Sequence, residues 1–394
     1  MELRKENTSL QQNYNLLSIM LFWCGLVIVA SNYLTIPLMS IFSEVFHTNI
    51  SYVAWTGSAF SLCYAIGSLF SGPLSDRFGR KKIILSGLLM LTVCTFAIPI
   101  LKSLSWVITF RSIQGFVAAS FAPVAIAYVV DKFPKQKRVT TIGLISSGFL
   151  ISAIVGQIFS SYISQQFGWE SVFYYSSAVY LMTSILILLI LPRTDIQQVN
   201  SNLKIMFQQF KTLLTDKNLL QAYSIAITLL LSFVAFYTIF GNYLMEKHSL
   251  NEEVILYVRM VGIIGMLFAP FAGKLANKYN LITVLRGGLT VGTLGIFIVG
   301  ISNNFFFAVT MSVVFVTGIA ITVPTLISIV GYLGGKNHSA AVSLYAFILF
   351  IGTSLGPIIA VLLLHTGSYL IAFLLLTLIL GIGLIISFFI KNKG

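Results

Sequence analysis

Residues 72–82 read Gly72-Pro-Leu-Ser-Asp-Arg-Phe-Gly-Arg-Lys-Lys82, a short basic segment between apolar runs at about 51–74 and 83–101. A helix needs roughly 20 mostly apolar residues to cross a membrane, and each flanking run has about that length. The segment is therefore predicted to be a tight connection between two membrane-spanning helices. The same alternation of long apolar runs and short polar connections continues along the whole chain.

The chain has 394 residues, of which 57% are hydrophobic and 9% are charged. Its apolar runs are continuous rather than alternating, which excludes a membrane β-barrel. The first run is too long for a signal-peptide core, so we expect it to be retained as a span. Twelve spans are predicted, at about 16–38, 51–74, 83–101, 104–130, 140–164, 171–191, 219–245, 253–273, 281–302, 305–331, 339–364 and 368–390. The remaining residues are too few for a soluble enzyme domain.

The net charge of +13 is explained by where the basic residues lie. If the N-terminus is cytoplasmic, only Lys102 and Lys247 fall in outside loops and only Arg111 and Arg259 fall within spans. The other 20 of the 24 Lys and Arg residues then lie in cytoplasmic segments. Lys and Arg are enriched on the cytoplasmic side of membrane proteins, so both termini are predicted to be cytoplasmic. The charge is a topological signal and not a nucleic-acid-binding surface.

An internal repeat relates the two halves of the chain. The segment that begins at Gly72 is matched by Gly273-Lys-Leu-Ala-Asn-Lys-Tyr-Asn, 201 residues later, and Gly156 is matched by Gly356, 200 residues later. A duplicated unit of six spans predicts two parallel halves with the substrate between them near the middle of the membrane. The predicted division is a tail at 1–15, a half at 16–191, a linker at 192–218, a half at 219–390 and a tail at 391–394. The linker is expected to lie along the membrane surface, or else to be a plain tether.

Segment 72–82 strongly resembles the signature loop of the major facilitator superfamily, and it stands where that family has it, between spans two and three. The resemblance covers nearly the whole chain and implies the all-α fold of that family. It also implies a polar latch that holds the outward-open state, formed by Gly72, Asp76, Arg77, Gly79, Arg80 and Asp131. The alternative is that the basic residues of the loop serve only to orient the chain. Asn277 and Lys278 replace the acid and the arginine in the second half, so we expect a weaker latch there.

The fifth span has Gly143, Gly148 and Gly156, which resemble a glycine-rich motif of the antiporter branch of that family. Gln157 departs from the motif where proline is expected. Small residues let helices approach closely, so these glycines are expected to pack between the halves. A similar packing role is expected in the eleventh span for Gly352, Gly356 and Pro357. The motif favours export over import.

No phosphate-binding loop is present, so an ion gradient is the expected energy source. All 11 acidic residues fall in loops or at span ends, and no acid lies mid-span to carry a proton. The charges inside the spans are Arg111, in a motif similar to the family's span-four motif, and Arg259. Because guanidinium groups favour carboxylates and phosphates, we expect an anionic or zwitterionic substrate, such as a polycarboxylate metabolite or a siderophore. Its own acid groups, or Asp76 and Asp131, would carry the proton.

Each of these two arginines also has a structural alternative. Arg111 could extend to the outer headgroups, and Arg259 could pair with Glu252 or Glu253. The further predicted substrate residues come from spans that line the pathway in that family: Asn32, Tyr33, Gln114, Tyr237, Asn242, Thr317 and Thr322. Each of these could instead serve helix packing.

The sequence shows no nucleophile–base set and no metal-ligand cluster, since its three cysteines are dispersed at Cys24, Cys63 and Cys94. No enzyme activity, metal or cofactor is expected. The predicted function is proton-coupled export of a small organic solute by a protein of the cell membrane that acts as a monomer among its lipids. The alternatives are a nutrient importer, a lipid flippase or a sensor on the same scaffold.

Overall fold

The computed structural model describes residues 13–192 and 203–390 of the chain, and these are almost entirely helical. Twelve helices within them are long and apolar enough to cross a membrane, which confirms the predicted number and class of elements. The spans are Tyr14–Tyr33, Ile50–Phe78, Arg80–Ile100, Leu104–Lys132, Lys135–Phe167, Trp169–Ile190, Lys217–His248, Val254–Tyr279, Leu281–Ile301, Phe305–Leu333, Gly335–Leu364 and Tyr369–Ser387.

Several spans are built from more than one helix. In the first six spans the elements are α1 (Tyr14–Ala30), η2 (Ser31–Tyr33), α2 (Met39–Val45), α3 (Ile50–Val53), α4 (Trp55–Phe78), α5 (Arg80–Ala97), η3 (Ile98–Ile100), α6 (Leu104–Ala118), α7 (Ala122–Lys132), α8 (Lys135–Phe167) and α9 (Trp169–Ile190). The remaining elements are α10 (Leu203–Thr215), α11 (Lys217–His248), α12 (Glu252–Met266), α13 (Phe271–Tyr279), α14 (Leu281–Ile301), α15 (Phe305–Leu333), η4 (Gly335–Asn337), α16 (His338–Leu364) and α17 (Tyr369–Ser387).

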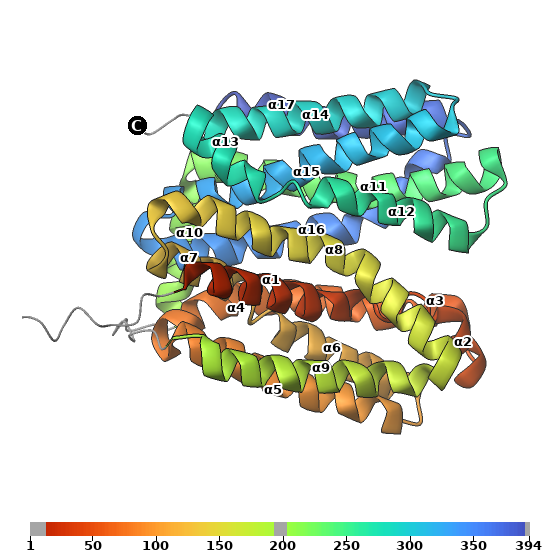
Figure 1. Cartoon of the computed structure of the whole chain (residues 1–394), viewed down its shortest axis with the longest axis horizontal. Helices are drawn as coiled ribbons and strands as arrows, with labels where there is room; N and C mark the ends of the chain where they lie inside the picture. Colours follow the sequence, from red (N-terminus) through yellow and green to blue (C-terminus); the bar gives the residue numbers. More distant parts are fainter. Residues whose placement is uncertain (1–12, 193–202, 391–394) are drawn as a thin grey trace, which may run out of the picture.

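The spans form two groups that pack against each other (Figure 1). The first group holds the spans from α1 to α9, and the second holds those from α11 to α17. At their interface α4 packs against α16, while α8 packs against α13 and α15. The interface therefore uses the second and fifth spans of the first group with the eighth, tenth and eleventh spans of the second.

One end of the bundle carries the latch segment, and we call it the Arg80 end. The ranges 76–82, 131–138 and 334–338 lie there. The described chain starts at this end, because the Tyr14 ring lies 5.4 Å from the Lys137 ammonium group. It also finishes there, close to the mark for the C-terminus in Figure 1.

The turns after the second and eighth spans share an unusual backbone conformation. Gly79 has a φ of +93°, and Asn280, 201 residues later, has a φ of +75°. Glycine adopts positive φ freely, and asparagine is among the few other residues that tolerate it. The same turn at the same repeat distance indicates that the two six-span units share one local geometry.

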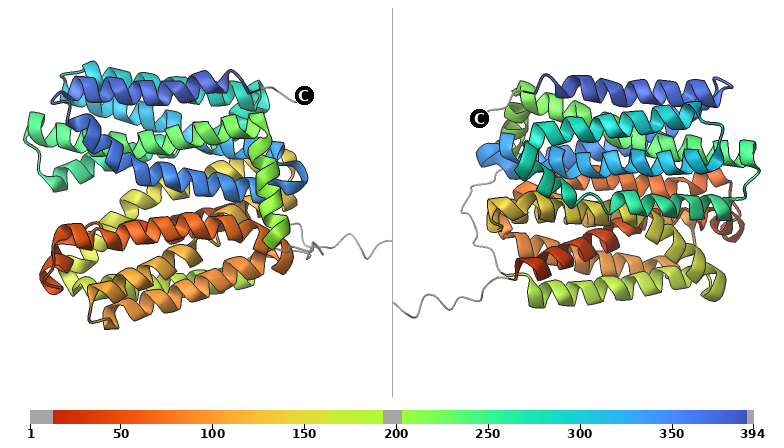
Figure 2. Two further views of the ribbon diagram at one scale, coloured as in Figure 1. Left: turned by 180° about the vertical axis from the view of Figure 1, so that it is seen from behind. Right: turned by 45° about the horizontal axis from the view of Figure 1, so that its top comes forward.

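The helix α10 crosses the Arg80 end at a steep angle to the spans, as the left view of Figure 2 shows. It packs against α11 and α16, and its Phe210 and Leu213 side chains are buried. The sequence predicted a linker here that either lies along the membrane surface or is a plain tether. Phe210 and Leu213 face the helical bundle, whereas Leu214 is exposed. Residues 193–202 of the predicted linker lie outside the described range.

Candidate functional site

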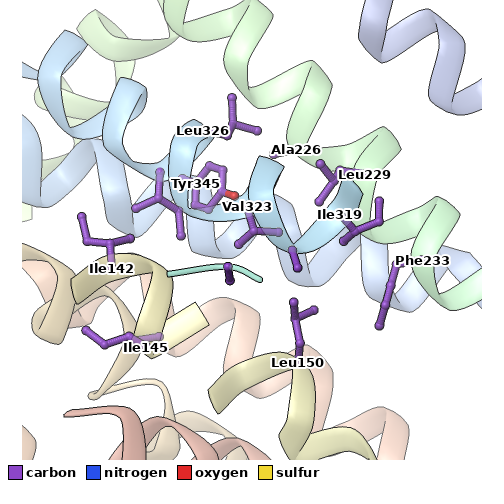
Figure 3. Close-up of a cluster of buried hydrophobic side chains, with 14 of the residues drawn as sticks. Ile142, Ile145, Leu150, Ala226, Leu229, Phe233, Ile319, Val323, Leu326 and Tyr345 are labelled. Carbon is purple, nitrogen blue, oxygen red and sulfur yellow. The ribbon is translucent and has the colours of Figure 1, made fainter. Parts of the chain in front are cut away.

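A central cavity lies between the two groups of spans. Its empty volume is about 770 Å³ when the space open to solvent is included. Side chains from α1, α4, α7, α8, α11, α15 and α16 line it, and Tyr33 of η2 joins them. Among the described lining residues the polar side chains are Tyr33, Tyr64, Ser146, Tyr345 and Thr353, and none is charged. In Figure 3, Leu150 of α8 points toward Val323 and Phe233 across the interface.

Arg80 is the centre of a charged cluster at the Arg80 end. It begins α5, directly after the Gly79 turn, and is only 4% exposed. Its guanidinium lies 2.5 Å from Asp76 Oδ1, at the end of α4, and 3.0 Å from Asp131 Oδ2, at the end of α7. It also donates to the hydroxyl of Ser75. The structure thus brings together three helix ends of the first half around one cation.

Residues of α16 join this cluster from the second half. Arg80 Nη1 donates to Ser339 Oγ at 2.7 Å, and His338 Nε2 lies 3.1 Å from Asp131 Oδ1. One helical turn deeper, the Gly72 N–H donates to Ser343 Oγ at 3.1 Å. These contacts connect the two halves across the Arg80 end.

The backbone of Gly72 approaches α16 too closely for any side chain. A Cβ added there would lie 2.6 Å from the Ser339 carbonyl oxygen and would overlap Ser343 Oγ. Gly72 is thus required for the contact between α4 and α16. The family resemblance placed Gly72 in the latch, and this contact joins the two halves there.

A second contact between the halves lies between α8 and the eighth span. Ser147 Oγ of α8 donates to the Met266 carbonyl at 3.0 Å, where α12 ends before Pro270. Proline interrupts a helix and leaves carbonyl groups without their usual donors, so Ser147 supplies a donor from the other half. Asn277, which replaces the acid of the first half, donates from Nδ2 to the Gln136 carbonyl at 3.4 Å. This contact is neutral, whereas Asp76 in the first half forms an ion pair with Arg80.

The glycines of the two repeats have two different packing roles. Gly143 lies against the Ala269 backbone of the other half. Gly148 and Gly156 instead pack against α1 of their own half, and Gly352 and Gly356 pack against α11 in the same way. The expectation that all three span-five glycines lie between the halves is therefore wrong for two of them, because α8 presents different faces to α1 and to the second half along its length.

Three further residues of the predicted latch and packing sets lie outside these contacts. Arg77 is exposed and its guanidinium lies 5.1 Å from the Phe78 ring centroid. Gly79 forms the positive-φ turn that places Arg80. Pro357 lies inside α16 on an exposed surface.

Arg111 is completely buried in the first half and lies outside the cavity lining. Its guanidinium donates to the carbonyls of Ser31 at 2.9 Å and Thr56 at 3.0 Å, and to Gln114 Oε1 at 2.9 Å. The two carbonyls belong to η2 and to the start of α4. Arg111 therefore fixes the end of the first span and the start of the second span to α6, and its contact with a substrate stays a prediction.

Asn32 and Tyr33 directly follow Ser31, whose carbonyl accepts a hydrogen bond from Arg111. The Asn32 carbonyl accepts from Arg111 Nη2 at 3.4 Å, and its side chain accepts from Ser61 Oγ at 2.9 Å. Tyr33 lines the central cavity, and of the predicted substrate residues it is the one found in the described lining. Gln114 is buried and donates to Thr95 Oγ1 at 2.7 Å.

Arg259 of α12 is half-buried, and its Nη2 donates to the Tyr237 carbonyl at 3.2 Å. The side chains of Glu252 and Glu253, its alternative partners in the sequence, lie outside the described residues. The other predicted polar residues of the second half bond to carbonyls of their own helices: Asn242 to Thr238, Thr317 to Val313 and Thr322 to Gly318. Each of these bonds lies within one helix, so a contact of these residues with a substrate stays a prediction.

Sequence reasoning did not identify the partners that α16 supplies to the cluster, His338, Ser339 and Ser343. It also missed the cavity hydroxyls of Tyr64, Ser146 and Tyr345. A polar start to the eleventh span was visible in the sequence as His-Ser, but its partners are more than 200 residues away. Among the described residues, no three His, Cys, Asp or Glu side chains gather in a way that could hold a metal ion.

Comparison with known proteins agrees with this architecture. An uncharacterized transporter of Buchnera aphidicola is 27% identical over 90% of this chain and 85% of its own length. A bicyclomycin resistance protein homolog of Haemophilus influenzae is 28% identical over 61% of each chain. An inner membrane transport protein of Escherichia coli is 24% identical over 66% of this chain and 63% of its own.

The family model of the Major Facilitator Superfamily matches residues 21–338, which is most of the chain. The match confirms the resemblance carried by residues 72–82, and with it the localisation to the cell membrane. The proteins of this family are transporters that act on small molecules and are not enzymes. Matched by this family model and with twelve candidate spans in its described residues, the chain belongs to the major facilitator superfamily of membrane transporters.

Proposed function

We propose that this protein is a secondary active exporter that moves a small organic solute by alternating access. The observation that supports it is the set of contacts that join the halves at the Arg80 end, below a central cavity. A cavity closed at one end and lined by both halves is what one state of an alternating-access cycle requires. Opening the Arg80 end and closing the other would carry a bound solute across.

We further propose that the Arg80 end faces the cytoplasm. With that orientation 20 of the 24 basic residues lie inside, as the distribution of Lys and Arg in membrane proteins favours. The described conformation is then outward-facing. Both termini and α10 lie on the cytoplasmic side in this assignment.

The sequence favoured an anionic substrate because two arginines lie within spans. In the structure neither Arg111 nor Arg259 belongs to the described cavity lining, and Arg111 is held by neutral oxygens of its own half. An ion in this cavity would lack a partner of opposite charge, which is costly in a medium of low dielectric constant. The geometry therefore supports an uncharged solute better than an anion. One relative is named for bicyclomycin resistance, so bicyclomycin is the first compound to test.

Proton coupling is part of the proposal, and His338 supports it. Its Nδ1 lies 3.2 Å from the Gly335 carbonyl and its Nε2 lies 3.1 Å from Asp131 Oδ1. This contact sets an imidazole of the second half against a carboxylate of the first, and His, Asp and Glu are the side chains that form proton relays in transporters. The other charged groups around this contact are Asp76 and Arg80 of the cluster and Lys336 of η4. We propose that Asp131, which contacts the second half here, carries the coupling proton.

The direction of transport is tested with inverted membrane vesicles that contain the protein. An inside-acidic pH gradient should drive uptake of radiolabelled bicyclomycin into these vesicles, and collapsing the gradient should stop it. Uptake by right-side-out vesicles instead would show import. If bicyclomycin is not moved, a comparison of solutes inside and outside cells with and without the gene identifies the compound that the deletion strain retains. Equal solute pools in both strains would contradict export.

The orientation has a separate test. Single cysteines at Lys81 and Lys336 are compared with single cysteines at Lys102 and Glu170, in a protein without its native cysteines. A membrane-impermeant thiol reagent applied to intact cells should label the second pair and spare the first. The opposite pattern would reverse the orientation and make the described state inward-facing.

A further inference from the structure

Three residues that line the central cavity have buried hydroxyl groups with no hydrogen-bond partner among the described residues: Tyr64 of α4, Ser146 of α8 and Tyr345 of α16. Tyr64 and Ser146 are 0% exposed and Tyr345 is 1% exposed. Buried polar groups in folded proteins are almost always paired, because an unpaired one has lost its hydrogen bonds to water. Three such groups around one cavity indicate a binding site for polar atoms.

The surroundings of these hydroxyls are apolar and aromatic. The Tyr64 ring stacks on Phe350 of the other half, with centroids 4.0 Å apart and an interplanar angle of 26°. Phe149 and Phe233 also line the cavity. Apart from its hydroxyls the described lining is therefore apolar and rich in aromatic rings, which suits an apolar aromatic molecule.

The three hydroxyls come from both halves of the protein. Tyr64 and Ser146 belong to the first half, and Tyr345 belongs to the second. Figure 3 shows Tyr345 of α16 near Val323 of α15, on the opposite side of the interface from Leu150 of α8. A solute that bonds to hydroxyls of both halves would connect them.

We propose that the hydroxyls of Tyr64, Ser146 and Tyr345 form the polar part of the substrate site, and that the substrate is an uncharged, largely aromatic molecule with neutral hydrogen-bonding groups. A hydroxyl can donate and accept, so it satisfies an alcohol, a carbonyl or an amide equally well. The described lining has no charged side chain to pair with an ion. This inference rests on the proposed transport function and names the substrate class of the same cavity.

The test uses three probes that share one aromatic body and differ in charge: naphthylmethanol, naphthylmethylammonium and naphthoate. Their binding to the purified full-length protein in detergent is followed by naphthalene fluorescence at equilibrium, without any ion gradient. Naphthylmethanol should bind about tenfold or more tightly than either charged probe, because a charge would be buried without a partner. Aromatic rings by themselves attract cations. Weak binding of the ammonium probe would therefore be stronger evidence for an uncharged substrate than weak binding of naphthoate.

Variants then locate the site. Tyr345→Phe and, independently, Ser146→Ala should each weaken naphthylmethanol binding about three- to tenfold, the usual effect of losing one hydrogen bond. Neither change should lower the melting temperature of the protein without ligand, because each removes a hydroxyl that had no partner there.

Tyr223→Phe is the matched control. Tyr223 is a tyrosine of α11 that is 2% exposed, lies outside the cavity lining, and has a hydroxyl that already donates to the Ala341 carbonyl at 3.2 Å. This variant should lower the melting temperature and leave probe binding unchanged. If the cavity hydroxyls had only a structural role, Tyr345→Phe would behave like Tyr223→Phe: the melting temperature would fall and probe binding would stay unchanged.

Tighter binding of naphthoate or of the ammonium probe would overturn the inference, as would a failure of naphthylmethanol to bind at its solubility limit. Unchanged affinity in Tyr345→Phe and Ser146→Ala would show that the hydroxyls serve only buried water. These outcomes leave the proposed export function standing, since that function is judged by gradient-driven flux in vesicles. If the protein binds the neutral probe normally but shows no flux in vesicles, the proposed export function is contradicted and the proposed binding site still stands.

Discussion

Gly72→Ala should push the halves apart at the Arg80 end. The new Cβ would lie 2.6 Å from the Ser339 carbonyl oxygen, which must retreat by about 0.8 Å to reach the 3.4 Å of ordinary contact. It would also overlap Ser343 Oγ, whose hydrogen bond to the Gly72 N–H would then be lost. Overpacking of this kind costs about 1–3 kcal/mol, so the closed state should lose about five- to 150-fold in population relative to the open one.

The assay measures how fast the cavity can be reached from the Arg80 side. A reporter cysteine replaces Ala346 in the cavity lining, and a membrane-impermeant thiol reagent is applied to inverted vesicles of a protein in which serine replaces Cys24, Cys63 and Cys94. Gly72→Ala should raise the labelling rate. Gly287→Ala is the control, because a Cβ added at Gly287 meets nothing within 4 Å. A labelling rate that stays the same or falls in Gly72→Ala would refute the reasoning.

Three further changes test other contacts. His338→Gln removes the ring beside Asp131, so reporter labelling from the Arg80 side should rise; an unchanged labelling rate would show that this contact does not help to close that end. Arg111→Met leaves the Ser31 and Thr56 carbonyls without this donor and should destabilise the protein by about 2–6 kcal/mol, at about 1–3 kcal/mol for each carbonyl. The change is measured as a lower melting temperature, and an unchanged value would contradict the bracing role. Gly79→Ala forces a side chain into a positive φ and should cost about 1–2 kcal/mol by the same measurement, while Gly287→Ala should not.

The number of spans and their order could be predicted from the sequence because they depend on local composition. Each span requires a continuous apolar stretch, and that stretch is visible without knowing its neighbours. The boundaries differ where charged residues continue a helix beyond the membrane: the run predicted at 253–273 is helical to Tyr279, because Lys274 and Lys278 extend α13 past the apolar part.

The latch could be predicted only in part, for a physical reason. Asp76 and Arg80 are four residues apart and meet across a single turn, so their pairing is a local property of the chain. Their partners Ser339 and His338 depend on how the halves dock, which no local pattern contains. A serine at the start of an apolar span looks the same whether it bonds to its own helix or to an arginine of the other half.

The substrate residues were the least predictable part of the site. A charge inside a span suggested function, and Arg111 was therefore expected in the cavity. The breaks at η2 and before α4 supply carbonyl acceptors that the sequence does not show, and these hold the guanidinium inside its own half. The cavity hydroxyls were missed for the opposite reason, because tyrosine and serine in a span usually pair with the backbone, and only the packed structure shows which ones do not.

The environment of Arg111 has an electrical consequence. Its described partners are neutral oxygens, so the first half carries an uncompensated positive charge inside the membrane that must move whenever that half rocks. Carrying one charge through the whole of a 100 mV field is worth about 2.3 kcal/mol, and a tenth of that path about 0.2 kcal/mol. We therefore expect membrane voltage to bias which way the transporter faces, and each half-cycle to produce a small displacement current even when the cargo is electrically neutral.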